Sequence, residues 1–105
     1  MSAVPNSLEE LIKQFSKLPG IGRKTAERLS IFILKANIDD VFEFSKTLKK
    51  IKENIKTCEM CHCFVESECY ICRDRSSNVI CVVEDATDVF LIDKSGFQGK
   101  FHVLG

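Results

Sequence analysis

The sequence lacks a long apolar run, a secretory leader and any net charge over its 105 residues. A helix that crosses a bilayer needs about 20 consecutive apolar residues, and no stretch of the chain approaches that length. The opening residues, MSAVPNSLEE, have neither the basic start nor the apolar core of a signal peptide. We therefore expect a protein without a membrane span that resides in the cytoplasm.

A net charge of zero ordinarily disfavours a nucleic-acid partner, but here the charges are unevenly divided. Residues 1–57 carry 11 Lys and Arg against 7 Asp and Glu, a net charge of +4, whereas residues 58–105 carry 4 against 8, a net charge of −4. The basic half is therefore the candidate for binding a polyanion. A chain of this length holds one small domain or two modules that each bury little core, and the contrast between the halves favours modules.

The chain does contain six cysteines, and the spacing of four of them is informative. Cys58 and Cys61 form C-x2-C, and after seven residues Cys69 and Cys72 form a second C-x2-C. Two such turns can bring four thiolates to one point, where a tetrahedral Zn2+ is the usual occupant. Four protein ligands leave no position for substrate or water, so the spacing predicts a structural zinc site.

Other uses of these cysteines are weaker alternatives. Iron–sulfur clusters also take four cysteines, but their usual spacings differ from this symmetric one. Disulfides are disfavoured in a reducing compartment. His62 and Cys63 follow Cys61 directly and are less well placed to close around the same ion, so we expect an exposed loop histidine and a small buried thiol.

Two amphipathic helices are expected near the N-terminus. A capping box of Ser7 and Glu10 predicts the start of the first helix, which Pro19-Gly20 should stop. The second helix should start directly after Gly22, bury its apolar end over residues 29–34, and finish near Asn37.

A third helix should follow, capped by Asn37 or Asp39. Its apolar residues recur at spacings of three and four, which predicts a stripe that lies in the core. Five lysines lie in or just after its last turns. They form either a solvated face or a surface that contacts phosphate. Phe42 lies off the stripe. The stripe comprises Val41, Phe44, Leu48, Ile51 and Ile55, and the lysines are Lys46, Lys49, Lys50, Lys52 and Lys56.

The segment Leu-Pro-Gly-Ile-Gly at residues 18–22 combines two glycines with an immediate helix start. Gly20 and Gly22 can take positive φ or allow a close backbone approach. The amides at the helix start suit phosphate oxygens, and Lys24 and Arg28 lie four apart on one helical face, where they add positive charge. The glycine spacing matches neither G-x-x-x-x-G-K-[ST] nor G-x-G-x-x-G. A tight interhelical turn with a solvated charged face remains the alternative.

After the cysteines the pattern changes to α/β. Residues 73–78 look like a polar linker, and the β-branched run at 79–83 predicts a strand covered on both faces, with Cys81 as a core thiol. Glu84 follows the strand at the edge where α/β sheets bind ligands. Asp85 and Asp88 suit a capping box for a helix that ends near Gly96, before a strand at 101–104. Two parallel strands make an incomplete sheet, so we expect a piece of a longer protein.

The stretch LPGIGRKTAERLS resembles the helix-hairpin-helix motif, which binds the DNA backbone without reading bases. With the two C-x2-C pairs and VICVVEDATDVFLIDKSGFQGKFHVLG, nearly the whole chain is similar to the bacterial RecR family of recombination mediators. The resemblance implies an α+β multi-module fold. It would comprise a helix-hairpin-helix DNA-binding module at 1–57, a four-cysteine zinc finger and linker at 58–76, and the first βαβ unit of a truncated Toprim domain at 77–105.

The same resemblance implies a function. Gly20, Gly22, Lys24 and Arg28 would contact DNA irrespective of sequence, and Glu84 would correspond to the acidic strand end of the Toprim domain, whose later aspartates lie beyond this sequence. The family is non-enzymatic, forms homo-oligomeric rings, and works with RecO and RecF to load the recombinase at gapped or broken DNA. A nucleoid-associated protein of the bacterial cytoplasm is expected.

Two alternatives belong to other functional classes. A Toprim-class Mg2+-dependent phosphodiester enzyme would use Glu84, with Asp85 and Asp88 as helpers. Mg2+ usually needs carboxylates together with substrate oxygens and waters, and no nucleophile is evident beside Glu84. A protein-interaction module would instead use the zinc finger and the third helix as a docking surface.

Overall fold

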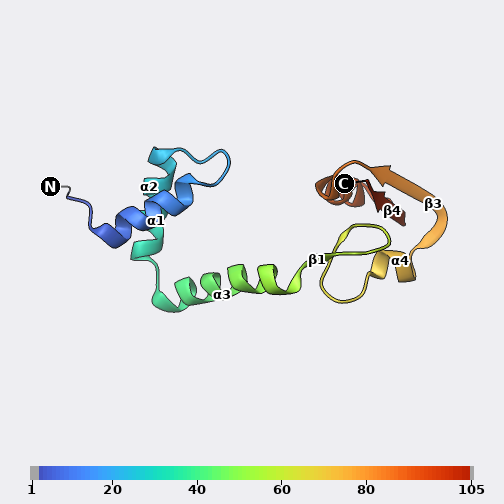
Figure 1. Cartoon of the computed structure of the whole chain (residues 1–105), viewed down its shortest axis with the longest axis horizontal. Helices are drawn as coiled ribbons and strands as arrows, with labels where there is room; N and C mark the ends of the chain where they lie inside the picture. The colour runs from blue at the N-terminus through green and yellow to red at the C-terminus, as the bar shows by residue number, and fades with distance from the viewer. Residues whose placement is uncertain (1–2, 105) are drawn as a thin grey trace. The chain divides into compact units, whose positions relative to one another are not determined.

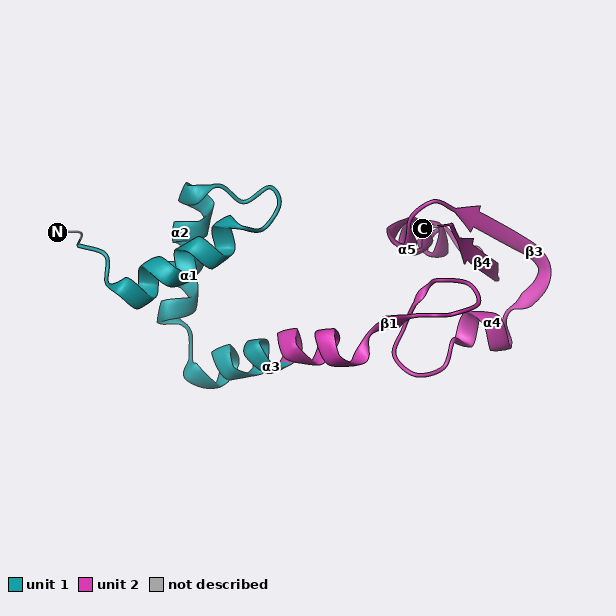
Figure 2. Ribbon diagram, viewed as in Figure 1, with its two compact units in different colours: residues 1–46 teal, residues 47–105 magenta. Residues whose placement is uncertain are grey.

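Residues 3–104 are described in a computed structural model of the chain (Figure 1). Contacts divide the chain into two compact units, residues 1–46 and residues 47–105 (Figure 2). The expected order of a helical part followed by cysteines and small strands is confirmed. The elements are α1 (Asn6–Ser16), α2 (Arg23–Lys35), α3 (Ile38–Asn54), β1 (Lys56–Thr57), β2 (Phe64–Val65), α4 (Tyr70–Asp74), β3 (Ser76–Val83), α5 (Ala86–Lys94) and β4 (Gly99–Val103).

The start of α1 differs from the expected capping box. The helix begins at Asn6, Pro5 occupies the N-cap with a φ of −58°, and no side chain caps the helix. The amide of Glu9 donates to the Pro5 carbonyl at 3.0 Å. Proline holds its φ near the helical value, so the first turn closes directly on Pro5. Ser7 therefore lies inside that turn, and the prediction of a cap by Ser7 and Glu10 was wrong.

The first unit is built on the contact between α1 and α2. Ile12 of α1 and Ala26 and Ser30 of α2 are its buried residues, with exposed fractions of 3%, 0% and 0%. The small side chains of Ala26 and Ser30 allow the two helix backbones to approach each other. The expected burial of residues 29–34 is largely wrong, because Phe32 and Leu34 are exposed. Side chains of consecutive residues point in all directions around a helix, and α1 covers only one side of α2.

Replacing Ser30 with alanine is expected to raise the free energy of unfolding of the first unit. The buried Ser30 hydroxyl has no hydrogen-bond partner in the described part of the chain. An unsatisfied buried polar group costs about 1–3 kcal/mol, so its removal should increase stability by about 1 kcal/mol. Denaturant unfolding followed by helical circular dichroism measures the change. Ser16→Ala is the control, because the Ser16 hydroxyl donates to Ile12 O at 2.9 Å and its loss should not stabilise. A less stable Ser30→Ala protein would contradict this account.

Helix α3 confirms its predicted cap but not its predicted core. Asn37 Oδ1 accepts a hydrogen bond from the amide of Asp39 at 2.8 Å. No residue of α3 is buried, and the stripe residues Phe44 and Leu48 are 48% and 51% exposed. Phe42, off the stripe, is exposed as well. Helical periodicity indicates the apolar face of α3, but among the described residues only Val41 of the stripe is partly covered.

The second unit contains elements that the sequence pattern did not reveal. β1 and β2 form a short antiparallel pair in which Thr57 lies opposite Phe64. Helix α4 and the first residues of β3 occupy the stretch 73–78, which was predicted to be a linker. That prediction was wrong, because the polar residues of β3 lie on an exposed part of the strand, where they need no apolar pattern.

The predicted βαβ unit is confirmed. β3 and β4 pair in parallel, with Cys81 opposite Phe101 and Val83 opposite Val103. Helix α5 connects them and begins with the expected capping box: Thr87 N donates to Asp85 Oδ1 at 3.2 Å, and Asp85 N donates to Asp88 Oδ2 at 3.3 Å. Gly96, directly after the C-cap of α5, has a φ of +98°, which glycine adopts without strain.

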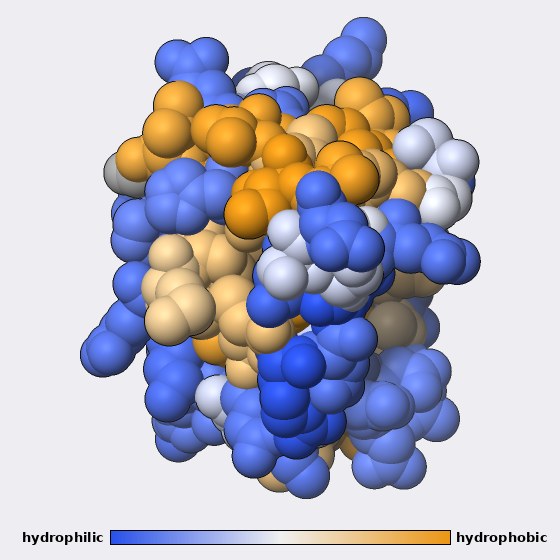
Figure 3. Space-filling model, turned by 90° about the vertical axis from the view of Figure 1, so that its right-hand side faces the viewer, coloured by the Kyte–Doolittle hydropathy of each residue, from blue (hydrophilic) through white to orange (hydrophobic). Residues whose placement is uncertain are grey.

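The expectation that β3 is covered on both faces is wrong. Val79, Ile80 and Val82 are all more than half exposed, and Cys81 is only partly buried. Figure 3 shows hydrophobic side chains gathered in a band on the side of the molecule that it faces. A β-branched run favours a strand, but cover on both faces depends on other elements. The core lies on one side and contains Cys61, Cys63, Val83, Ala86, Val89, Phe101 and Val103.

Candidate metal centre and nucleic-acid interface

The first cysteine pair lies on the loop that follows β1. The amide of Cys58 donates to Cys63 O at 2.8 Å, and the amide of His62 donates to Cys58 O at 2.9 Å. These bonds close a tight turn in which His62 takes a φ of +66°. The amide of Val103 donates to Cys61 O at 2.8 Å, which joins the loop to β4. The βαβ unit therefore helps to position this pair.

The second pair lies at the start of α4. Cys69 is the N-cap residue, and its Sγ accepts a hydrogen bond from the amide of Cys72 at 3.5 Å. A helical turn places residues three apart on one side, so Cys69 and Cys72 face the same way. The short helix that was not predicted from the sequence therefore orients half of the cysteine cluster.

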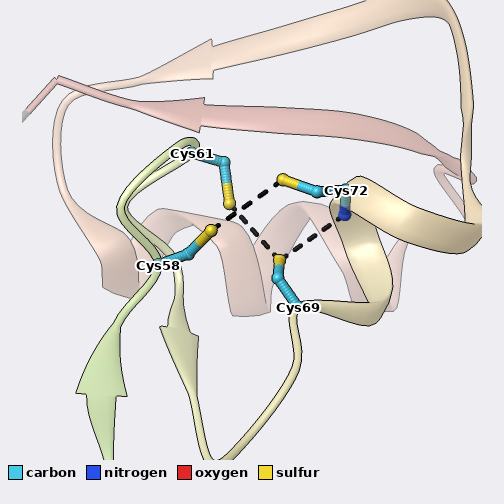
Figure 4. Close-up of side chains that lie close together, drawn as sticks. All are labelled: Cys58, Cys61, Cys69 and Cys72. Carbon is cyan, nitrogen blue, oxygen red and sulfur yellow. Dashed lines mark hydrogen bonds between the residues drawn. The ribbon is translucent and has the colours of Figure 1, made fainter.

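The four sulfur atoms come together at one point (Figure 4). All of them lie within 4.8 Å of one another. Cys58 Sγ is 3.9 Å from Cys72 Sγ, and Cys61 Sγ is 3.5 Å from Cys69 Sγ. Zinc bonds of about 2.3 Å in a tetrahedron place sulfurs about 3.8 Å apart. The donor set and its spacing are therefore compatible with zinc, and among the described residues no other group of histidine, cysteine and acidic side chains has this arrangement.

The thiols of the cluster differ in acidity. Backbone hydrogen bonds, above all from Cys61 and then from Met60, lower the pKa of Cys58 to about 6. Burial raises the pKa of Cys69 and of Cys72, and neighbouring thiols add to the effect at Cys72. Four thiolates at one point repel one another, so full ionisation needs a cation among them.

Cys63 and His62 lie beside the cluster but outside it. Cys63 is buried with 2% exposure, and burial raises the pKa of its thiol to about 12. His62 is exposed, and its Nδ1 lies 2.8 Å from Val103 O. Its ring centroid is 5.4 Å from that of His102 on β4. His62 thus forms a second link between the cysteine loop and β4, which the sequence pattern could not reveal because 41 residues separate the bonded pair.

The glycines of the hairpin play different parts. Gly20 has a φ of +79°, in the left-handed region, where the turn between α1 and α2 reverses. Gly22 is the N-cap of α2 with a φ of −85°, and no atom lies within 4 Å of the position of an added Cβ. Only Gly20 therefore meets the expected need for an unusual backbone angle, while the space beside Gly22 leaves its backbone open to an approaching ligand.

Lys24 and Arg28 are exposed on α2, and the part of the chain that the structure describes offers neither side chain an ion pair or a hydrogen bond. Lys35 lies seven residues beyond Arg28, two helical turns along the same face. Arg23 is different, since its guanidinium binds Glu9 and Glu27. Neither Lys35 nor Arg23 was predicted from the sequence as a functional residue, although the spacing of seven residues places Lys35 on the same helical face as Arg28.

Glu84 lies directly after β3 and is exposed. An open depression beside it is lined by Thr57, His62, Asp85 and Val103, among others. Asp85 and Asp88, the expected helpers of a Mg2+ site, are engaged in the capping box of α5. Asp85 nevertheless lines the same depression as Glu84, but among the described residues Glu84 belongs to no group of three or more possible metal ligands.

Comparison with known proteins assigns the family. The family model described as "RecR, helix-hairpin-helix" matches residues 8–52. A protein of Desulfatibacillum aliphaticivorans named "Recombination protein RecR" is 47% identical over 99% of this chain. The chain belongs to the RecR family. A relative of the same name from Staphylococcus saprophyticus is 44% identical over 95% of the chain. The chain spans about half of these RecR relatives, 54% and 52% of their lengths.

Proposed function

We propose that this chain is the DNA-binding part of a recombinational repair protein and that it binds the DNA backbone irrespective of sequence. The supporting observation is the state of Lys24 and Arg28, which follow the Gly20 turn on one exposed face of α2 without a partner among the described residues. Backbone amides at the start of α2 add hydrogen-bond donors for a phosphate oxygen. Lysine, arginine and backbone amides are the groups that commonly contact phosphate oxygens, so we expect phosphate contacts to carry the binding.

Zinc on Cys58, Cys61, Cys69 and Cys72 is proposed to be structural. The four cysteines pack against the βαβ core, so the ion would hold the cysteine loop and α4 against β3 and β4. The corresponding division is a helix-hairpin-helix module at 1–57, a zinc finger and linker at 58–76, and the start of a Toprim domain at 77–105. We infer no catalytic role for Glu84, because it belongs to no group of three or more possible metal ligands among the described residues, and Asp85 and Asp88 each use one carboxylate oxygen in the capping box of α5.

The wider function is proposed from the family. The chain would act with RecO- and RecF-type proteins to load the recombinase onto DNA, in the bacterial cytoplasm at the nucleoid, and it would assemble into a homo-oligomeric ring in the longer protein. Two phosphate contacts bind weakly, and several linked copies gain affinity without new contacts. The exposed apolar stripe of α3 supports assembly, because such a face is stabilised by burial. No helix in the described residues is long and apolar enough to cross a membrane.

The double substitution Lys24→Ala/Arg28→Ala tests the DNA contact. Each phosphate contact contributes about 0.9 to the slope of log affinity against log salt on duplex DNA, so the double variant should lose about 1.8 of that slope. Fluorescence anisotropy with two unrelated duplex sequences at several salt concentrations measures it. Affinity should fall equally for both sequences.

The control is Lys13→Ala/Lys94→Ala, which removes the same charge from exposed positions on α1 and α5, outside the basic residues of α2 and α3. It should keep the slope of the unsubstituted protein. If the two double variants lose the same slope, general charge and not the α2 face accounts for binding. Equal affinity of the Lys24/Arg28 variant and the unsubstituted chain, with helical circular dichroism unchanged, refutes the proposed contact.

A further inference from the structure

Arg23 begins α2 beside the proposed phosphate contacts, but its guanidinium is already occupied. Its two terminal nitrogens, Nη1 and Nη2, donate to Oε1 and Oε2 of Glu9, each at 2.8 Å. Its Nε donates to Oε1 of Glu27 at 2.9 Å. Arg23 is thus held by a bidentate pair across the interhelical turn and by a second carboxylate one helical turn further along α2.

These ion pairs lie at the surface, within reach of a polyanion. The side chains of Arg23, Glu9 and Glu27 are 50%, 32% and 48% exposed. The fork shape that fits a carboxylate also fits a phosphate, so both anions compete for the same edge of the guanidinium. Among the described residues, Glu27 accepts only from Nε, and Glu9 is the one residue that accepts from the two terminal nitrogens.

We propose that Glu9 masks Arg23 and thereby limits the number of phosphate contacts at the hairpin. This inference rests on the proposed function, since it concerns the strength of the same DNA site. In the free protein Lys24 and Arg28 are available and Arg23 is not. Removal of Glu9 leaves the terminal nitrogens of Arg23 unpaired at the start of α2, where a third phosphate oxygen can bind them.

The masking has a mechanistic consequence for a protein that must bind any DNA and release it. Each added phosphate contact makes binding tighter and more dependent on salt. With two phosphate contacts instead of three, a single copy of the protein has a low affinity for DNA. Tight binding then requires several copies on one DNA. Glu9 would therefore be a residue that sets affinity without touching DNA.

The test compares Glu9→Ala with Glu10→Ala in the 105-residue chain. Both variants remove one negative charge from the same turn of α1, and Glu10 is exposed without a described partner. We expect Glu9→Ala to steepen the salt slope on duplex DNA by about 0.9, whereas Glu10→Ala leaves it unchanged. Between about 50 and 200 mM salt, the extra contact makes the loss of affinity about 3.5-fold larger.

Arg23→Gln identifies the side chain responsible. In the unsubstituted background, Arg23→Gln should leave the salt slope unchanged, because the masked residue makes no phosphate contact. Added to Glu9→Ala, it should remove the whole gain. Thermal unfolding is recorded beside each titration, since a purely structural clamp predicts a lower melting temperature for Glu9→Ala with the same slope as Glu10→Ala.

The outcomes separate the two proposals. Salt-dependent binding by the unsubstituted chain, with equal slopes for Glu9→Ala and Glu10→Ala, overturns the masking and leaves the DNA site standing. A steeper slope for Glu9→Ala that survives Arg23→Gln also overturns it, because another group is then responsible. Absence of DNA binding in every variant overturns both proposals.

Discussion

Substitution of Cys58 by serine is expected to abolish zinc binding and to unfold residues 47–105, while the helices of residues 1–46 remain folded. The four cysteines pack against the same core as β3, β4 and α5. Without a cation the cluster consists of thiols in contact with one another, and burial raises the pKa of two of them, Cys69 and Cys72. Structural zinc sites contribute about 10–16 kcal/mol of apparent binding free energy to folding. That contribution is comparable with the whole stability of a small domain, about 5–15 kcal/mol.

Metal analysis and amide hydrogen exchange measure the two parts of this expectation. The unsubstituted chain should carry one zinc per molecule, and a chelator should reproduce the effect of the substitution. Cys81→Ala is the matched control, because Cys81 is a thiol on β3 outside the cluster and its loss should leave one zinc bound. The idea fails if Cys58→Ser protein retains one zinc per chain and exchange protection across β3 and β4.

Replacing Phe101 with alanine is expected to lower the unfolding free energy of the second unit by about 3–5 kcal/mol. Phe101 is 2% exposed and is the largest fully buried side chain among the described residues. Its ring meets that of Phe97 edge to face at 5.2 Å, and the Arg75 guanidinium lies 5.8 Å from its centre. The substitution removes these contacts and leaves a cavity beside the cysteine loop.

Zinc-loaded protein is the material for this measurement, with unfolding followed by circular dichroism in denaturant. Phe90→Ala on α5 is the control, because Phe90 is 51% exposed and should cost less than about 1 kcal/mol. Similar losses in the two variants would show that the buried position of Phe101 contributes no more than an exposed one. A destabilised Phe101→Ala protein should also release zinc to a chelator faster, because the same core supports both.

Features that depend on a few neighbouring residues were predictable. The capping box of Asp85 and Asp88, the cap by Asn37 and the positive φ at Gly20 all depend on bonds or angles within four residues. The spacing of the cysteines belongs to this class, since each C-x2-C turn is a local structure. Ser7 shows the limit of such reasoning, because a proline two residues earlier offered another start for the helix.

Burial was not predictable from the pattern alone. The apolar residues of α3 and β3 have the periodicity of covered elements, yet Leu48 and Val82 are more than half exposed. A pattern reports what a segment would gain from being covered, and cover depends on what else lies in the molecule. For the same reason the small residues Ala26 and Ser30 form the buried contact of α2 with α1, in place of the larger apolar residues that follow them.

The sequence by itself determined the helical order of the first part of the chain, the βαβ order and the candidate ligand set, because each rests on local spacing. It did not reveal β1, β2 and α4, the short elements around the cysteines. Tertiary structure decided which of the charged side chains near the hairpin already form ion pairs. Arg23, Lys24 and Arg28 look alike in the sequence, and only the approach of Glu9 from α1, 14 residues away, occupies the terminal nitrogens of Arg23. The position of the cysteine loop on β4 was decided in the same way, by the bond between Val103 and Cys61. Such contacts join residues that no local pattern connects.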